Sequence, residues 1–209
     1  LTVLNLSWNQ ISDGGLQELD HVLACNSSLQ QLQLGGCGLG AEGVKGLAGI
    51  LRSASSLAHV DLHHNLIGPS SIRVIGEALA SRSMLLSLDV SENMIGSWGV
   101  GDLFSFLPCS VTRLNLWNNR IHAEGCRRLA GALPRLESLQ SLTLRSNDIK
   151  DAGCSLVVSS LSRGIRHLDL RENMITEEGA KAIAENLPSM RKLSCLMLDT
   201  NLIGDDGAK

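Results

Sequence analysis

Two stretches of this sequence hold residues whose types and spacing suit binding chemistry, and the first is rich in glycine. Gly38, Gly40 and Gly43 form the pattern GxGxxG directly after the alternating segment QLQL. Asp61 follows about 20 residues later, as in a dinucleotide-binding motif. In such a motif the glycines let the backbone approach a pyrophosphate, and the acidic residue binds the ribose. A nucleotide cofactor is therefore the first hypothesis to test against the rest of the chain.

The second stretch is an alternation of titratable side chains. His59, Asp61 and His63 occupy every other position of one predicted strand, with His64 beside them, so their side chains point to one side of it. His and Asp are common zinc ligands. At the rise of a strand, however, His59 and His63 are separated by roughly 13 Å, which is too far for one ion. We therefore expect a polar binding patch here and no bound metal.

Both stretches belong to a unit that recurs along the whole chain. The first unit begins LTVLNLSWNQI, and the pattern LxxLxLxxNxL returns, with aliphatic substitutions, every 26 or 28 residues. The units begin at residues 1, 29, 57, 85, 111, 139, 165 and 193. Self-similarity at a near-constant period is typical of a repeat architecture.

Each unit combines a strand with a helix. The alternating leucines of its first half indicate a strand. Its second half carries apolar residues four positions apart, such as Leu47 and Leu51, which is helical spacing. A glycine recurs at one offset before these residues, with Ser71 in its place in the third unit. These glycines are Gly15, Gly43, Gly99, Gly125, Gly153, Gly179 and Gly207.

Stacking of these units predicts the shape of the domain. A single unit cannot bury its aliphatic residues alone, so neighbouring units must pack together. Helices are roughly 10 Å wide and adjacent strands ~4.8 Å apart, so the stack bends with the strands inside. An Asn after each strand, replaced by Cys37 in the second unit, can bond backbone groups of its own coil and the next. We expect one α/β domain over residues 1–209, a horseshoe solenoid of about seven and a half repeats with parallel strands on the concave face and helices on the convex face.

This pattern resembles the ribonuclease-inhibitor-like class of leucine-rich repeat proteins over the whole length of the chain. The core LxxLxLxx(N/C)xL with a helical back half, in units of 26 to 28 residues, carries the resemblance. Members of the class include the ribonuclease inhibitor, the ligand-sensing ends of nucleotide-binding innate immune receptors, Ran GTPase-activating protein and several ciliary scaffolds. The resemblance implies a binding protein without identifying which member of the class it is.

The repeat register decides how the glycines and cysteines are interpreted. The other units make the same strand-to-helix passage without Gly38 or Gly40, and only Gly43 sits at a shared position. We therefore expect a glycine-rich turn and no cofactor. Cys126 and Cys154 fall on neighbouring helices about 10 Å apart, beyond the ~7 Å limit for a disulfide. Because the six cysteines also include no CxxC pair, we expect buried free thiols in a reducing compartment.

Strand residues between the core leucines point into the concavity, where they are free to contact a partner. Trp8 and Trp117 are predicted on this face, and exposed Trp is enriched in binding hot spots. Trp98 is instead expected on the outer rim, before a helix, in a structural role. The candidate partner-binding residues are Trp8, Asp61, His63, Asp89, Glu92, Arg113, Trp117, Arg145 and Arg171.

The charged candidates separate along the stack. The acidic ones fall in the third and fourth units and the basic ones in the fifth to seventh. Since adjacent strands lie ~4.8 Å apart, each group is predicted to make a local field of one sign that steers and orients a partner.

The composition limits the class of partner. The chain has 18 basic and 21 acidic residues and a net charge of −3, which does not favour nucleic acid. No apolar run approaches the ~20 residues that span a bilayer, so no membrane insertion is expected. Free thiols favour an intracellular, cytoplasmic location. Because Leu1 opens directly on a strand pattern and Lys209 follows the start of a helix, we expect the chain to be a segment of a longer protein.

These observations favour a non-catalytic recognition module or scaffold that binds a protein on its concave face. No nucleophile and base, and no carboxylate pair, occur in a setting that would tune them for catalysis. The resemblance implies two alternatives. One is activation of a small GTPase, in which Arg113, Arg145 or Arg171 acts on the nucleotide site. The other is ligand sensing in a nucleotide-binding innate immune receptor.

Overall fold

The computed structural model describes residues 1–11, 13–23, 25–80 and 84–209. Within these ranges every unit contributes one strand and then one helix, as predicted. The strands are β1 (Val3–Asn5), β2 (Gln31–Gln33), β3 (His59–Asp61), β4 (Ser87–Asp89), β5 (Arg113–Asn115), β6 (Ser141–Thr143), β7 (His167–Asp169) and β8 (Cys195–Met197). The helices are α1 (Asp13–Leu23), α2 (Ala41–Ser53), α3 (Pro69–Leu79), α4 (Gly96–Phe106), α5 (His122–Ala132), α6 (Lys150–Ser160), α7 (Glu177–Asn186) and α8 (Gly204–Gly207), with short 3-10 helices at Leu133–Arg135 and Leu187–Ser189.

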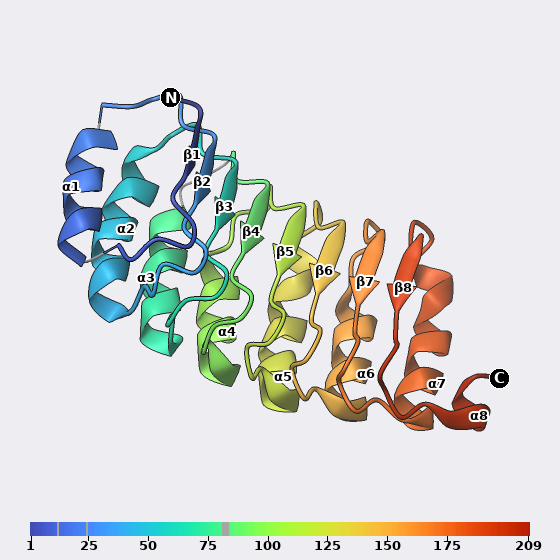
Figure 1. The fold of residues 1–209 in the computed structure, drawn as a ribbon. Coiled ribbons are helices and arrows are strands. Elements are labelled where there is room, and N and C mark those ends of the chain that lie inside the picture. Colours follow the sequence, from blue (N-terminus) through green and yellow to red (C-terminus); the bar gives the residue numbers. More distant parts are fainter. Residues whose placement is uncertain (12, 24, 81–83) are drawn as a thin grey trace.

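The strands form one parallel sheet in chain order, β1 to β8 (Figure 1). Neighbouring strands pair at the same repeat position throughout, so that Leu4 lies beside Leu32 and Leu32 beside Val60. The chain therefore advances by one strand per repeat, and every repeat position forms a continuous row across the sheet.

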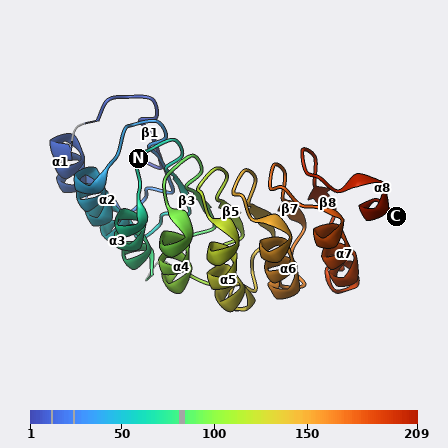
Figure 2. The same ribbon diagram turned by 90° about the horizontal axis from the view of Figure 1, so that it is seen from below.

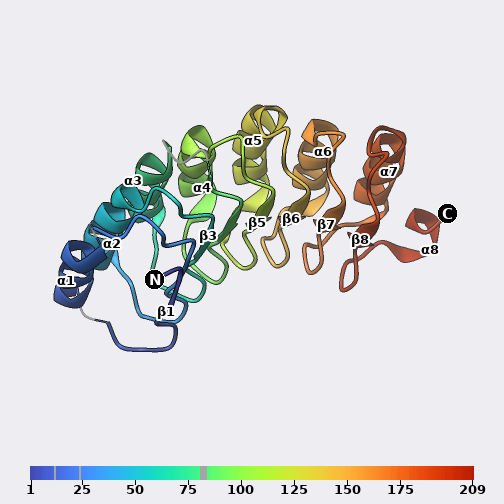
Figure 3. The ribbon, with the colours of Figure 1, turned by 90° about the horizontal axis from the view of Figure 1, so that it is seen from above.

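Views from below and from above show a curved stack (Figures 2 and 3). The helices line its outer, convex side, and the strands lie inside the curve. The two ends of the chain lie at opposite ends of the stack. The prediction of an open horseshoe solenoid with the strands on the concave face is confirmed.

The core lies between the sheet and the helices. At the centre of each inner strand, residues such as Leu88, Leu114 and Leu142 are at most 2% exposed. Helix residues from the same repeats, including Leu103 and Leu129, are fully buried against them. Because these side chains are nearly identical aliphatic groups stacked one repeat on the next, the core is continuous along the solenoid.

The recurrent Asn joins neighbouring repeats. Asn147 is 1% exposed; its amide donates to the carbonyls of Leu144 and Arg145 in its own repeat and of Leu116 in the preceding one. Its side-chain oxygen accepts the backbone N–H of Asn119. The predicted link between coils is therefore present, but it runs to the preceding coil and not to the next one.

Candidate partner-binding face

The concave face is edged by a row of residues with left-handed backbone, each three positions after the end of a strand. Their φ angles lie between 51° and 64°, a conformation that costs non-glycine residues roughly 1–2 kcal/mol. In the first seven repeats the backbone N–H donates to a carbonyl of the following repeat, as Trp8 does to Gly35 at 2.7 Å. The row consists of Trp8, Gly36, His64, Glu92, Asn118, Ser146, Glu172 and Thr200.

Trp8 extends across the second repeat to the third. Its side chain is 65% exposed, and its ring lies 5.6 Å from that of His63 and 5.1 Å from that of His64, centroid to centroid. Gly35 and Gly36 make this contact possible. A Cβ atom at Gly35 would lie 2.1 Å from the His63 ring, and one at Gly36 would lie 2.3 Å from Trp8.

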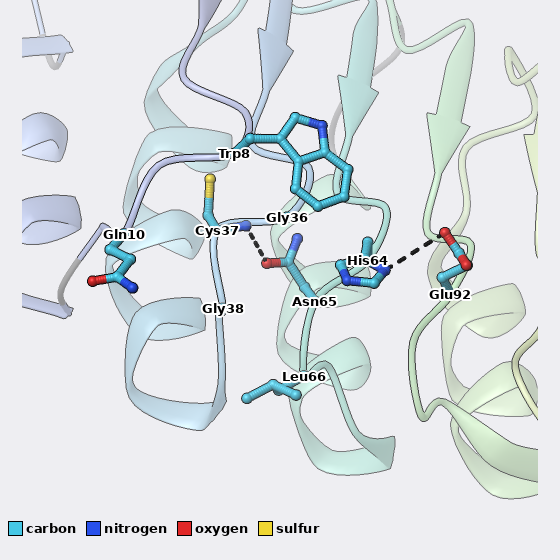
Figure 4. Close-up of a pocket in the computed structure, with 9 residues that line it drawn as sticks. All are labelled: Trp8, Gln10, Gly36, Cys37, Gly38, His64, Asn65, Leu66 and Glu92. Carbon is cyan, nitrogen blue, oxygen red and sulfur yellow. Dashed lines mark hydrogen bonds and ion pairs between the residues drawn. The ribbon is translucent and has the colours of Figure 1, made fainter.

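A pocket of about 420 Å³ opens beside this aromatic cluster (Figure 4). Trp8 lies over the backbone at Gly36, and the side chain of Leu66 lies at the opposite edge. His64 and Glu92 stand on one side, with His64 Nδ1 3.6 Å from a carboxylate oxygen of Glu92. The pocket is lined by Trp8, Gln10, Gly36, Cys37, Gly38, His64, Asn65, Leu66 and Glu92.

The acidic candidates lie beside polar side chains of the same part of the face. Asp61 and Asp89 are register partners on β3 and β4. His63 Nδ1 lies 2.7 Å from Asp61, and Asp89 accepts hydrogen bonds from Ser91 and Asn115 at 2.6 and 2.8 Å. Among the described residues, no ion pair joins Asp61, Asp89 or Glu92 to a lysine or arginine. The concave face of the third and fourth repeats therefore carries carboxylates that no lysine or arginine neutralises within the described ranges.

The prediction of a positive field is wrong for Arg145 and Arg171. Arg145 forms an ion pair with Glu172, whose carboxylate also accepts from Ser146. Arg171 binds both carboxylate oxygens of Asp169, at 2.9 and 2.7 Å. Hydrogen bonds from Arg145 and then Ser146 lower the pKa of Glu172. Each of these two arginines is thus neutralised by a carboxylate that was not among the candidate binding residues, because repeat spacing does not reveal which partner a long side chain reaches.

Arg113 does not join the other two arginines. It stands at the start of β5, in register with Ser87 and Ser141, whereas Arg145 follows the end of β6. Its guanidinium points toward the acidic repeats and lies 3.4 Å from His59 Nδ1. Burial, and then the charge of Arg113, lower the pKa of His59.

The three tryptophans have different surroundings. Trp117 is half-buried on the concave face, with the Arg145 guanidinium 5.2 Å from its ring centroid. Trp98 was predicted to stand before a helix, but it lies inside α4. It is 68% exposed on the convex side, where Arg128 stacks 3.7 Å from its ring centroid. As predicted, neither Trp8 nor Trp117 belongs to the packed core.

The six cysteines are free. Cys126 and Cys154 lie on adjacent helices and are buried, and burial raises the pKa of each to about 12. Cys25 and Cys109 are exposed and Cys195 is half-buried, so the expectation of buried thiols is wrong for these three. Among the described residues, no group of three His, Cys, Asp or Glu side chains is placed to hold a metal ion. The helices of the same ranges are all too short or too polar to cross a membrane.

Comparison with known proteins identifies the family of these repeats. The family model described as Leucine Rich repeat matches residues 1–19, 25–48, 108–130, 135–158 and 163–184, which together make up more than half of the chain. The chain belongs to the leucine-rich repeat family. A chain in the crystal structure of the yeast Rad7 and Elc1 complex has the same fold, with a TM-score of 0.73 at 19% identity over 99% of this chain and 52% of that one.

Curated relatives match this leucine-rich repeat chain over about half its length. The human NACHT, LRR and PYD domains-containing protein 13 and the mouse ribonuclease inhibitor are each 32% identical over 48% of the chain. RAN GTPase-activating protein 2 of Arabidopsis thaliana is 27% identical over 45%. These matches cover 10%, 23% and 18% of the three relatives, respectively. The resemblance to the ribonuclease-inhibitor-like class is confirmed.

Proposed function

We propose that this chain is a non-catalytic, intracellular recognition module that binds a protein partner on its concave face. The observation that carries the proposal is the position of Trp8. Trp8 is 65% exposed, yet its ring contacts His63 and His64 and packs against Gly36, where no side chain blocks it. An exposed and positioned Trp is the kind of side chain that contributes most to protein interfaces.

The chain offers a matched control for this proposal. Trp8 on the concave face and Trp98 on the convex face are 65% and 68% exposed, so replacing either by Ala removes similar exposed surface. Affinity capture from source cells with wild type, Trp8→Ala and Trp98→Ala separates the two faces. We expect Trp8→Ala to lower the affinity for the captured partner by about tenfold or more, as for a hot-spot residue. We expect Trp98→Ala to capture the partner as wild type does. Equal retention by both variants contradicts the proposal.

Activation of a GTPase is the second candidate, because RAN GTPase-activating protein 2 is among the relatives. An arginine that acts on a bound nucleotide must be available to it. Arg145 and Arg171 are both engaged by carboxylates here, which leaves Arg113 as the most exposed candidate. Measuring GTP hydrolysis by Ran with and without the chain tests this function, and no acceleration rejects it. Ligand sensing, suggested by the match to a NACHT-containing relative, is a form of the leading proposal.

A further inference from the structure

The second repeat forms a notch in the concave rim. It carries glycine at three positions, Gly35, Gly36 and Gly38, where the other repeats carry larger side chains. At the offset of Gly38, for example, the third and seventh repeats place Leu66 and Met174, which are 57% and 55% exposed. A Cβ atom at Gly38 would meet nothing within 4 Å. Gly38, one of the three glycines of the pattern that resembles a nucleotide-binding motif, therefore leaves an open space on the face proposed to bind a partner.

The walls of the notch differ chemically from end to end. The indole of Trp8 lies along one edge and the aliphatic side chain of Leu66 along the other (Figure 4). The carboxylate of Glu92 stands at the far side. The ring atom His64 Nδ1 lies 3.6 Å from one of its oxygens, beyond hydrogen-bond distance, so its oxygens remain able to accept. A long side chain with an apolar stem and a cationic end matches this arrangement.

The same combination of side chains, with its cation in place, occurs further along this face. Trp117, Arg145 and Glu172 form a series in which the guanidinium lies 5.2 Å from the indole centroid and bonds the carboxylate. Glu92 and Glu172 occupy the same repeat position, and both have left-handed backbone. Near Trp8 and Glu92, no arginine or lysine lines the pocket. The aromatic and acidic components are thus present in the notch, and the cation is supplied by no lining residue.

We infer that the notch between Trp8, Leu66 and Glu92 receives an arginine side chain of the protein partner. The guanidinium stacks on the Trp8 indole, as planar cations do on aromatic rings, and donates hydrogen bonds to Glu92. Asp89, in the same repeat as Glu92, adds to the negative potential that attracts it. Arginine fits better than lysine, because a planar guanidinium can stack on an aromatic ring and donate hydrogen bonds to a carboxylate at the same time. The inference rests on the proposed function and names the chemistry that the partner must present.

A small probe tests this site without the partner. N-acetyl-arginine amide is titrated into the folded chain while the indole N–H signal of Trp8 is followed by NMR, with the neutral N-acetyl-citrulline amide and N-acetyl-lysine amide as comparisons. We expect the arginine probe to shift the Trp8 signal saturably at millimolar concentration. We expect Glu92→Gln to weaken this binding by about tenfold, since it removes a charge-assisted hydrogen bond.

A second variant blocks the notch while keeping the fold. Gly38→Met introduces the residue that the seventh repeat carries at this offset, where Met174 has a φ of 56°. It should abolish the response to the arginine probe. The matched control, Arg120→Met, places methionine at the same offset in the fifth repeat and should leave the response unchanged. Heteronuclear NMR spectra establish that both variants are folded.

Three results overturn the inference: no response to the arginine probe, an equal response to citrulline or lysine, or a response that survives Gly38→Met. Failure here is distinguishable from failure of the proposed function. If the arginine probe does not bind but Trp8→Ala still loses the partner, the concave face binds by other contacts. If the probe binds but both tryptophan variants retain the partner, the notch is real and the proposed function is wrong.

Discussion

The indole of Trp8 and the imidazole of His64 lie 5.1 Å apart between ring centroids, although they belong to the first and third repeats. The side chain of the intervening repeat would normally separate them. Gly36 occupies that position, and its backbone has a φ of 64°. The absence of one Cβ atom therefore determines where the most exposed aromatic ring of the concave face lies.

Gly36→Ala should separate the two rings. The new methyl group would lie 2.3 Å from Cε3 of Trp8, and because the indole is exposed, the ring moves more easily than the backbone. All seven other repeats carry a larger residue at this position with positive φ, so the fold should persist at a cost of about 1–2 kcal/mol in unfolding free energy. Loss of the nuclear Overhauser contact between Trp8 and His64 is the measurement. Ser146→Ala, at the same offset in the sixth repeat, should preserve the contact, and its persistence in Gly36→Ala contradicts the prediction.

The hydrogen bonds between repeats predict that loss of the buried Asn147 amide strongly lowers the stability of the fold. Asn147→Ala would leave the backbone N–H groups of Asn119 and Ile121 and the carbonyl of Leu116 without their side-chain partner. Each buried group left unpaired costs roughly 1–3 kcal/mol, so we expect unfolding free energy to fall by about 3 kcal/mol or more. Urea denaturation followed by circular dichroism measures this change.

The control for that experiment is the same substitution in the first repeat. Asn9 is exposed, and its side-chain amide donates to the carbonyls of Leu6 and Ser7 in its own repeat. Because water can replace this amide, Asn9→Ala should cost about 1 kcal/mol or less. Similar losses for both variants would show that the bonds between repeats do not stabilise the solenoid.

The sequence was sufficient for the fold because its regular part is governed by one recurring pattern. Every core row, such as that of Leu88 and Leu114, follows from alternation within a strand and a fixed repeat length. The binding face does not follow such a rule. Neither the pairing of Arg145 with Glu172 nor that of Arg171 with Asp169 has a counterpart in every repeat, because the identities of these residues vary from unit to unit.

One feature of the site did leave a signal in the sequence. Gly35 and Gly36 stand at positions where most repeats have a side chain, and comparison across repeats reveals a gap large enough for a neighbouring ring. The path of Trp8 into that gap could not be predicted. It depends on the left-handed backbone at Trp8, with a φ of 61°, which most non-glycine residues avoid.

Arg113 should control the titration of His59. Burial and the nearby guanidinium lower the pKa of His59 in the folded chain, whereas the unfolded chain takes up a proton near pH 6.5. The unfolded state therefore binds more protons, and this residue's contribution to stability is lost as pH falls below about 6.5. Arg113→Gln should raise the pKa of His59, though not fully, because burial is the larger cause. NMR titration of the His59 ring measures the shift. The convex-face variant Arg127→Gln should not change it, and an unchanged or lower pKa in Arg113→Gln contradicts the assignment.

The cysteines should divide into fast and slow groups toward iodoacetamide. Cys25 and Cys109 are exposed, whereas burial raises the pKa of Cys126 and Cys154 to about 12. The thiolate is the reacting form, so at pH 8 about one in ten thousand of these buried thiols is ionised. Peptide mapping after native labelling should show Cys25 and Cys109 modified first, and the difference should vanish in urea. Labelling of Cys126 as fast as Cys25 in the native chain would mean that α5 and α6 separate readily, because reagent reaches this thiol only when the two helices part.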